Sequence, residues 1–149
     1  MGQFKNAGLN VQEYVYDFAV DGGATGEIIL SNKANREPIP VGAVIKAVTL
    51  KVLTTFTSDG SATLEWGNGD DPNGYSGATI AVASLTAGAV FNGWDNAAAL
   101  IWDDTNDHQI PVNIADAADG RVSVTIATAA MTAGKAVIMV EYLHPAASA

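Results

Sequence analysis

Apolar and polar residues alternate along most of this chain, and that period of two constrains its fold more than any other feature. In segment 44–56, valine, leucine and phenylalanine alternate with threonine and lysine, and segments 62–66 and 122–127 repeat the pattern. Successive side chains of a β-strand point to opposite sides, so this alternation is typical of strands with one buried face. Segment 136–143 is apolar on both faces apart from Glu141, which predicts a central strand buried on both sides.

Segment 11–20 fits two periodicities. Val11, Tyr14, Val15 and Phe18 would form a helical stripe, whereas the aromatic residues in this stretch also fall on one face of a strand. Because the segment is rich in aromatic and β-branched residues and runs straight into Asp-Gly-Gly, we favour the strand. Segment 27–30 then reads as a short return strand.

Turn chemistry separates these segments. Ser-Asp-Gly-Ser at 58–61 predicts a hairpin, 67–74 a long polar loop, and 79–85 a single helical turn. Short strands with such regular turns predict an all-β fold. We expect a single-domain antiparallel β-sandwich, either a plain sandwich or a jelly roll.

The chain has room for one domain. Its 149 residues suit a single core. We expect an N-terminal arm or first strand over residues 1–25, the sandwich over 26–145, and a frayed tail over 146–149. No internal repeat is visible.

The charge is acidic and unevenly placed. The formal net charge is −9, and charged residues make up 15% of the chain. No lysine or arginine occurs between Lys51 and Arg121, where ten acids are found: Asp59, Glu65, Asp70, Asp71, Asp95, Asp103, Asp104, Asp107, Asp116 and Asp119. Such a surface repels phosphate and anionic lipid, so we expect neither nucleic acid nor membrane as a partner.

The sequence lacks the features of secreted and membrane proteins. It has no cysteine, its first residues lack the apolar core of a signal peptide, and no run approaches the length of a membrane span. We expect a soluble protein made in a cytoplasm.

Residues able to carry catalysis are scarce. His108 and His144 are the only histidines, and neither lies in a nucleophile, metalloprotease or phosphate-loop motif. Glu65 lies opposite the apolar face of its segment, where a solvated side chain is expected. We predict that the chain is not an enzyme and needs no cofactor.

Two loops carry oxygen ligands suited to calcium. Asp70, Asp71 and Asn73 lie in one loop, and a run of acids and Asn lies at 103–107. Neither loop matches the spacing of a calcium-binding loop, and Asp and Asn are also common turn formers. We therefore expect no metal site.

Three tryptophans invite a carbohydrate-binding interpretation. Trp66 alternates with Leu64 and should belong to the core. Trp94 and Trp102 flank polar turns and could be exposed, either to stack on sugar rings or to contact protein. The sequence leaves these two readings open.

Four segments, taken in their order along the chain, carry a resemblance to a known protein family. They are Tyr-Asp-Phe-Ala-Val-Asp-Gly-Gly-Ala-Thr-Gly at 16–26, Ile-Pro-Val-Gly-Ala-Val-Ile at 39–45, Ser-Ala-Thr-Leu-Glu-Trp-Gly-Asn-Gly-Asp-Asp-Pro-Asn-Gly at 61–74, and Thr-Ala-Gly-Lys-Ala-Val-Ile-Met-Val-Glu-Tyr at 132–142. The arrangement resembles head decoration, or capsid cement, proteins of tailed bacteriophages over roughly residues 11–143. The likeness lies in strands and turns, so no functional residue transfers with it.

The resemblance implies a β-sandwich subunit assembled as a homotrimer. It would bind the outside of the virion's capsid and bridge neighbouring major capsid proteins. Tyr14, Tyr16 and Phe18 would then be contact residues on an N-terminal arm, with Trp94 and Trp102 as further candidates; the first three could equally fill the subunit's own core. A carbohydrate-binding module and a tail or neck structural protein remain as alternatives.

Overall fold

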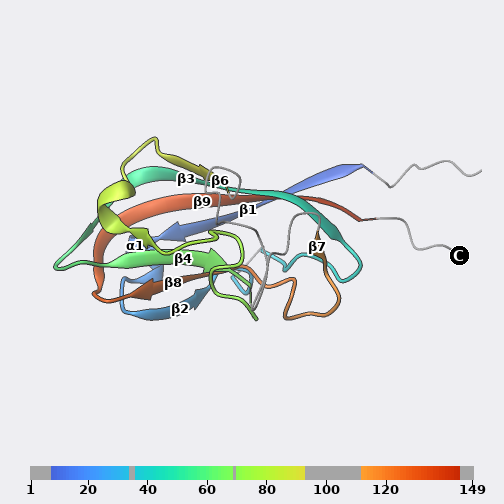
Figure 1. Cartoon of the computed structure of the whole chain (residues 1–149), viewed down its shortest axis with the longest axis horizontal. Coiled ribbons are helices and arrows are strands. Elements are labelled where there is room, and N and C mark those ends of the chain that lie inside the picture. Colours follow the sequence, from blue (N-terminus) through green and yellow to red (C-terminus); the bar gives the residue numbers. More distant parts are fainter. Residues whose placement is uncertain (1–7, 34–35, 69, 93–111, 145–149) are drawn as a thin grey trace, which may run out of the picture.

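The chain folds into two antiparallel β-sheets packed face to face, which confirms the predicted β-sandwich (Figure 1). The computed structural model describes residues 8–33, 36–68, 70–92 and 112–144. The larger sheet contains, in spatial order, β1 (Leu9–Asp17), β9 (Met131–Leu143), β3 (Val44–Ser58) and β6 (Val90–Asn92), with β7 (Val112–Asn113) also paired to β3. The smaller sheet contains β2 (Gly26–Ile29), β8 (Ser123–Ala127), β4 (Thr63–Gly67) and β5 (Ile80–Ala81).

The strand order is that of a jelly roll. If β7 is set aside, the first strand pairs with the last, the second with the second-last, and so inward: β1 with β9, β2 with β8, β3 with β6, and β4 with β5, all antiparallel. This is the pattern of one long folded hairpin rolled into two sheets. Of the two folds that the sequence left open, the topology is the jelly roll.

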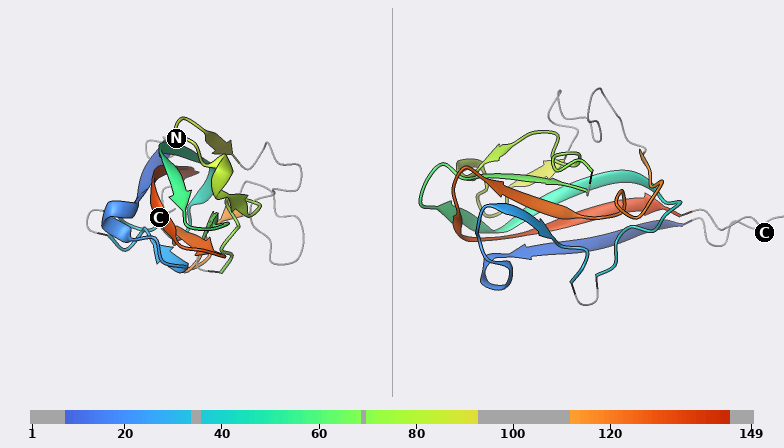
Figure 2. Two further views of the ribbon diagram at one scale, coloured as in Figure 1. Left: turned by 90° about the vertical axis from the view of Figure 1, so that its left-hand side faces the viewer. Right: turned by 90° about the horizontal axis from the view of Figure 1, so that it is seen from below.

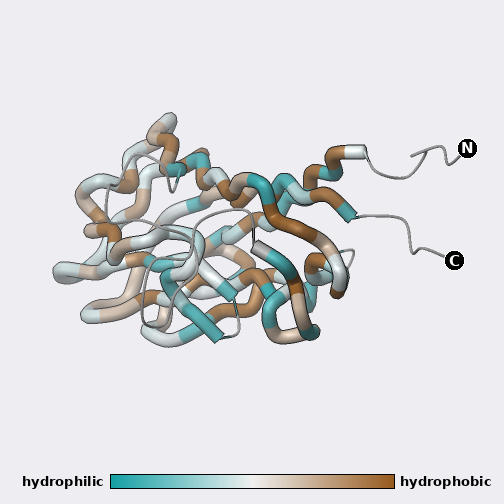
Figure 3. Tube along the Cα trace, turned by 45° about the vertical axis from the view of Figure 1, so that its right-hand side comes forward, coloured by the Kyte–Doolittle hydropathy of each residue, from teal (hydrophilic) through white to brown (hydrophobic). Residues whose placement is uncertain are grey.

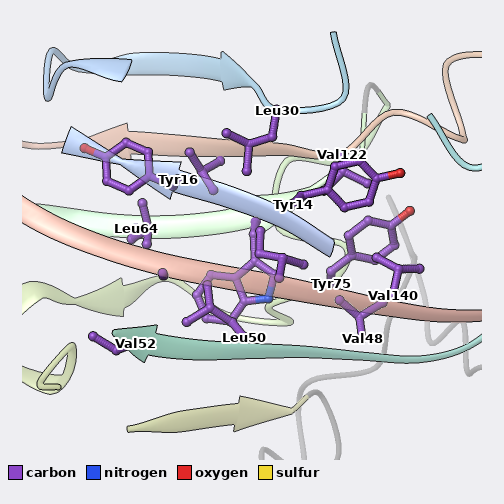
Figure 4. Packing of buried hydrophobic residues seen from close by; sticks show 14 of the residues in the cluster. Tyr14, Tyr16, Leu30, Val48, Leu50, Val52, Leu64, Tyr75, Val122 and Val140 are labelled. Carbon is purple, nitrogen blue, oxygen red and sulfur yellow. The ribbon is translucent and has the colours of Figure 1, made fainter. Parts of the chain in front are cut away.

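The core lies between the two sheets. From β3 of the larger sheet, Val48, Leu50 and Val52 turn inward, and Leu64 of β4 lies opposite them in the smaller sheet (Figure 4). Trp66 of β4 is buried in the same core. All five are at most 1% exposed. The predicted inward faces of the strands at 44–56, 62–66 and 122–127 are therefore confirmed.

Aromatic rings fill the space at several points in this core. Tyr16 stacks on Phe56 with ring centroids 5.5 Å apart, and Trp66 meets Phe91 edge-on at 5.9 Å. The core placement of Trp66 expected from sequence is confirmed. Tyr75 is fully buried, and burial raises the pKa of its hydroxyl well above the usual range.

The hairpin expected at 58–61 is wrong, and segment 27–30 does not return along the strand that precedes it. The turn at 58–61 joins β3 of the larger sheet to β4 of the smaller one, and the turn after β1 leads to β2, which pairs with β8. These turns reverse the chain as predicted, but they carry it from one sheet to the other. Figure 2 shows the two layers that these crossings connect. The 79–85 stretch does contain a helical turn, the 3₁₀ turn η1 (Val82–Ser84).

The ambiguous segment after residue 11 contains both predicted structures in turn. Residues Leu9–Asp17 form a strand paired with residues 135–143 of β9, and Phe18–Asp21 form one helical turn, α1. Asp17 ends the strand because its carboxylate accepts a hydrogen bond from Ala19 N, while its own N–H donates to Asp21 Oδ2. Phe18 therefore lies on the helical turn, where sequence alternation had placed it on the strand.

Candidate assembly surface

The outer face of the larger sheet is the first candidate, because its outward side chains are apolar at the centre. On β9, Val137 and Met139 point away from the core and are only half-buried. In register, Val15 and Lys51 lie beside Val137, and Glu13 lies beside Met139. The sequence predicted that this strand would be covered on both faces. Within the described residues only its inner face is fully covered, which leaves an apolar strip open.

Exposed apolar residues extend this strip to both sides of the sheet. Leu9 and Val11 of β1 are each 57% exposed, Leu53 of β3 is 45% exposed, and Val90 of β6 is 54% exposed. Val90 pairs with Lys51, so it continues the same outward row. In Figure 3, apolar and polar segments alternate along the strands, as expected for strands with an inner and an outer face. An exposed apolar surface of this kind is typical of a protein contact.

The outer face of the smaller sheet differs in composition. Glu27, Thr125 and Glu65 form one row across β2, β8 and β4. Thr79 Oγ1 donates a hydrogen bond to the Glu65 carboxylate. Arg121 lies 3.8 Å from Glu27. This face carries charged side chains, and none of its described residues is a large exposed hydrophobic one, so it is the weaker candidate.

Strand β1 forms one edge of the larger sheet, and half of that edge is blocked. The Val15 carbonyl accepts a hydrogen bond from Arg36 Nη1 at 2.8 Å, and Asp17 N–H donates to Asp21. Because backbone groups of an antiparallel strand alternate in direction, the N–H and C=O groups of Leu9, Val11 and Glu13 also point outward. Among the described residues no backbone group pairs with them. The end of the edge that carries the exposed apolar residues is thus also the open end.

Two of the predicted contact residues lie inside the subunit. The rings of Tyr14 and Tyr16 are at most 1% exposed, and their hydroxyls donate to Glu37 O at 2.6 Å and Gly22 O at 2.8 Å. Burial raises the pKa of both hydroxyls, that of Tyr16 to about 12, so both stay protonated at neutral pH. The sequence left open whether these rings contact a partner or fill the subunit's own core, and in the structure both lie in the core.

The remaining predicted contact residues are Phe18, Trp94 and Trp102. Phe18 is partly buried and packs against the core from α1. Trp94 and Trp102 lie outside the described residues, as do His108 and the acidic run at 103–107. The structure therefore brings none of these aromatic residues together on a described surface.

The loop at 67–74 uses its acids as turn formers. Asn68 Oδ1 accepts from the N–H groups of Asp70 and Asp71, and Asp71 Oδ1 accepts from Asn73 N. Such local bonds are the common use of Asn and Asp in turns. These bonds agree with the interpretation of the Asp and Asn residues of this loop as turn formers.

A second acidic group was missed by sequence reasoning. Asp70 comes from one loop and Asp116 and Asp119 from another, and their carboxylate oxygens lie within 4.8 Å of one another. Partial desolvation, followed by the negative charges of Asp116 and Asp119, raises the pKa of Asp70. Asp119 Oδ2 accepts from the N–H groups of Ala115 and Asp116, so its carboxylate holds its own loop. The only sequence signal was the turn at Asp119-Gly120, which says nothing about Asp70.

No protein-family model and no curated protein matches this sequence. Among the described residues, no helix has the length and apolar character that crossing a bilayer requires. Three solved structures share the fold along almost the whole chain. In the cyanophage Pam1 capsid asymmetric unit the match has a TM-score of 0.59 and 19% identity, covering 97% of this chain and 91% of the other.

The other two matches are comparable. The acidic stable capsid structure of Helicobacter pylori bacteriophage KHP30 matches with a TM-score of 0.52 and 16% identity, over 93% of this chain and 89% of that one. The capsid of Ralstonia phage GP4 matches with a TM-score of 0.50 and 19% identity, over 93% and 86%. At these identities the likeness establishes a shared jelly-roll fold.

Proposed function

We propose that this chain is a structural virion protein of a tailed bacteriophage, which binds the outside of the capsid and stabilises it by bridging neighbouring major capsid proteins. Its partners are the major capsid protein and other copies of itself, assembled as a homotrimer. It acts as a scaffold and not as an enzyme, and it works on the virion after synthesis in the host cytoplasm.

One observation carries this proposal: the fold is shared from end to end with chains of three phage capsid structures. The coverage is high in both directions, so the likeness extends over most of each matched chain and is not limited to a common fragment. A shared fold does not by itself fix function. The outer face of the larger sheet adds an independent reason to expect assembly.

The chemistry of the surface suits such a role. A bridging subunit needs a stiff body and an apolar contact face, and the jelly roll supplies both, with Val137 and Met139 at the centre of that face. A protein that binds the assembled shell and not the dissociated subunits stabilises the shell by mass action. The net charge of −9 disfavours direct contact with the packaged genome.

Co-sedimentation with heads tests the proposal. The purified chain is mixed with expanded heads of the phage that encodes it, prepared without this protein, and free and bound fractions are separated by centrifugation. We expect saturable binding in proportion to the number of capsid subunits, together with a higher temperature of head disruption. Absence of binding to heads contradicts the proposal. A few copies per virion, located at the tail or neck, would support that alternative instead.

A further inference from the structure

Two basic residues on the larger sheet lack an acidic partner within the described residues. Elsewhere Lys33 pairs with Asp21, and Lys135 lies 3.1 Å from Asp17. Lys46 and Lys51 of β3 are both exposed, and neither forms an ion pair with any described residue. Arg36 also forms no ion pair with a described residue, but its guanidinium donates to the Val15 carbonyl, so the lysines left without a partner on the larger sheet are the two of β3.

Unmatched acids lie on the same sheet. Glu13 of β1 is exposed and Glu141 of β9 is half-buried, and neither forms an ion pair with a described residue. Glu13 neighbours Met139 in register, whereas Lys51 neighbours Val137 and Val90. On the rows of Met139 and Val137 the outer face therefore carries an acid on β1, apolar residues on β9 and a lysine on β3.

Each charged side also carries exposed apolar residues. We call Leu9, Val11 and Glu13 the acidic strip, and Lys51, Leu53 and Val90 the basic strip. Strand β9 lies between β1 and β3, so the strips are about 10 Å apart at the usual spacing of neighbouring strands. Both strips lie on the outer face of the same sheet, and they are alike in apolar character and opposite in charge.

We propose that the acidic strip of one copy packs on the basic strip of a second copy. The charge order favours this occupant, because each strip offers what the other lacks. Copies of a chain with a net charge of −9 repel one another at most orientations. An ion pair between Glu13 and Lys51 of a neighbour opposes that repulsion at the place where the apolar residues meet.

The contact deepens the proposed function, since it identifies the surface used for self-assembly. Because the two strips differ, the contact joins unlike surfaces, and such head-to-tail contacts close into a ring when the rotation between copies permits. A homotrimer is one such ring. The free end of β1, where Arg36 no longer blocks the edge, is the part of the acidic strip that can approach a neighbour.

Charge exchange tests the contact. The oligomeric state of Glu13→Lys, Lys51→Glu and the double variant is measured by sedimentation velocity over a range of concentrations. We expect each single change to weaken association at least tenfold and the double change to restore it. The pair Asp59→Lys with Lys51→Glu is the control, because it also restores the net charge but places the new lysine in the β3–β4 turn. It should not restore association.

Cross-linking provides a second measurement that tolerates weak association. The chain has no cysteine, so Glu13→Cys and Lys51→Cys introduce single thiols. Positions 13 and 51 of one chain are two strands apart, too far for an internal disulfide. We expect disulfide-linked pairs when the two variants are mixed and oxidised, and few when either is oxidised alone.

Several results would overturn the inference. These are a monomeric wild-type chain that gives no mixed cross-link, single charge reversals that leave association unchanged, or a double variant that fails to recover. If the reversals preserve association but abolish binding to heads, the strips contact the capsid lattice and the inference is wrong while the proposed function stands. If association follows the expected pattern but the chain never binds heads, the proposed function fails and the contact between copies remains.

Discussion

The two sheets of this jelly roll have similar inner faces and different outer faces. Outward from the larger sheet, Val137 and Met139 lie at the centre, with exposed apolar residues on either side. Outward from the smaller sheet, Thr125 lies between Glu27 and Glu65. The two sheets bury their inner residues against each other, so both inner faces are explained by the folding of the subunit alone. The difference is therefore informative about assembly: among the described residues, the large exposed apolar side chains of the two sheets lie on the strands of the larger one, and such surface is typical of a protein contact.

The edges of the two faces sharpen this comparison. At β1 the larger sheet blocks its own edge with Arg36 and Asp21 next to Val15 and Asp17, and leaves the part near Leu9 and Val11 open. An unprotected edge strand invites pairing with other chains. A sheet that is protected over one half and open over the other is suited to a specific contact and not to general aggregation.

The largest effect is expected from the inner face. On β3, Leu50 is fully buried and Leu53 is 45% exposed. Leu50→Ala should lower the free energy of unfolding by about 2–5 kcal/mol, because it leaves a cavity in the core. Leu53→Ala should change it by less than about 0.5 kcal/mol. Urea denaturation of the two variants measures both values; equal losses would contradict the assignment of inner and outer faces.

The next effect compares the two outer faces directly. Val137→Lys places a charge in the apolar strip and should weaken self-association and head binding at least tenfold, or about 1.4 kcal/mol. Ala127→Lys is the matched control, since Ala127 is half-buried like Val137 but lies on the outer face of the smaller sheet, beside Thr63. Sedimentation velocity and co-sedimentation with heads provide the measurements. Equal loss in both variants, or in neither, would remove the distinction between the faces.

A smaller effect is expected at two buried serines beside the smaller sheet. Ser31 Oγ accepts a hydrogen bond from Val122 N at 3.1 Å, whereas Ser123 Oγ has no hydrogen-bond partner in the described structure. Ser31→Ala should lower the free energy of unfolding by about 1 kcal/mol, because it leaves a buried N–H unpaired, and Ser123→Ala should be neutral or stabilising. Thermal unfolding of the two variants tests this, and a larger loss at Ser123 would contradict it.

The smallest effect is expected at the acidic group. The raised pKa of Asp70 means that the folded state binds its proton more tightly than the unfolded state does. Its ionised form therefore lowers stability above the folded pKa, and this loss disappears as the pH falls through that value. Asp70→Asn should raise the unfolding midpoint slightly at pH 7 and leave it unchanged at pH 3. Asp59→Asn, in the exposed β3–β4 turn, is the control for the change in net charge, and a gain at pH 7 as large as that of Asp70→Asn would contradict the prediction.

Local pattern predicted the strands well and their partners poorly. The alternation at 44–56 located β3 and its buried residues, because side-chain direction in a strand depends only on position along the chain. The turn at 58–61 was correctly placed, yet the hairpin drawn from it was wrong, because turn residues favour reversal without choosing the sheet that the next strand joins. In a jelly roll most partners are distant in sequence: β1 pairs with β9.

The acidic group and the contact face illustrate the same limit. Asp70 is far in sequence from Asp116 and Asp119, so only the meeting of two loops brings their carboxylates together. Glu13 and Lys51 likewise lie on one face only because β9 separates and aligns their strands. The aromatic residues near the N-terminus were predicted to be either partner contacts or core residues, because their alternation could not say whether the buried side faced the subunit's own core.

The sequence by itself determined that the chain builds strands, which side chains of each strand are apolar, and that the surface is acidic, since these follow from local geometry and composition. Only the tertiary structure decided the jelly-roll order, the crossing of the chain between sheets, and which apolar residues remain uncovered. The physical reason is that each strand's apolar face can be buried against many partners, and the choice among them depends on pairing between residues that are far apart along the chain.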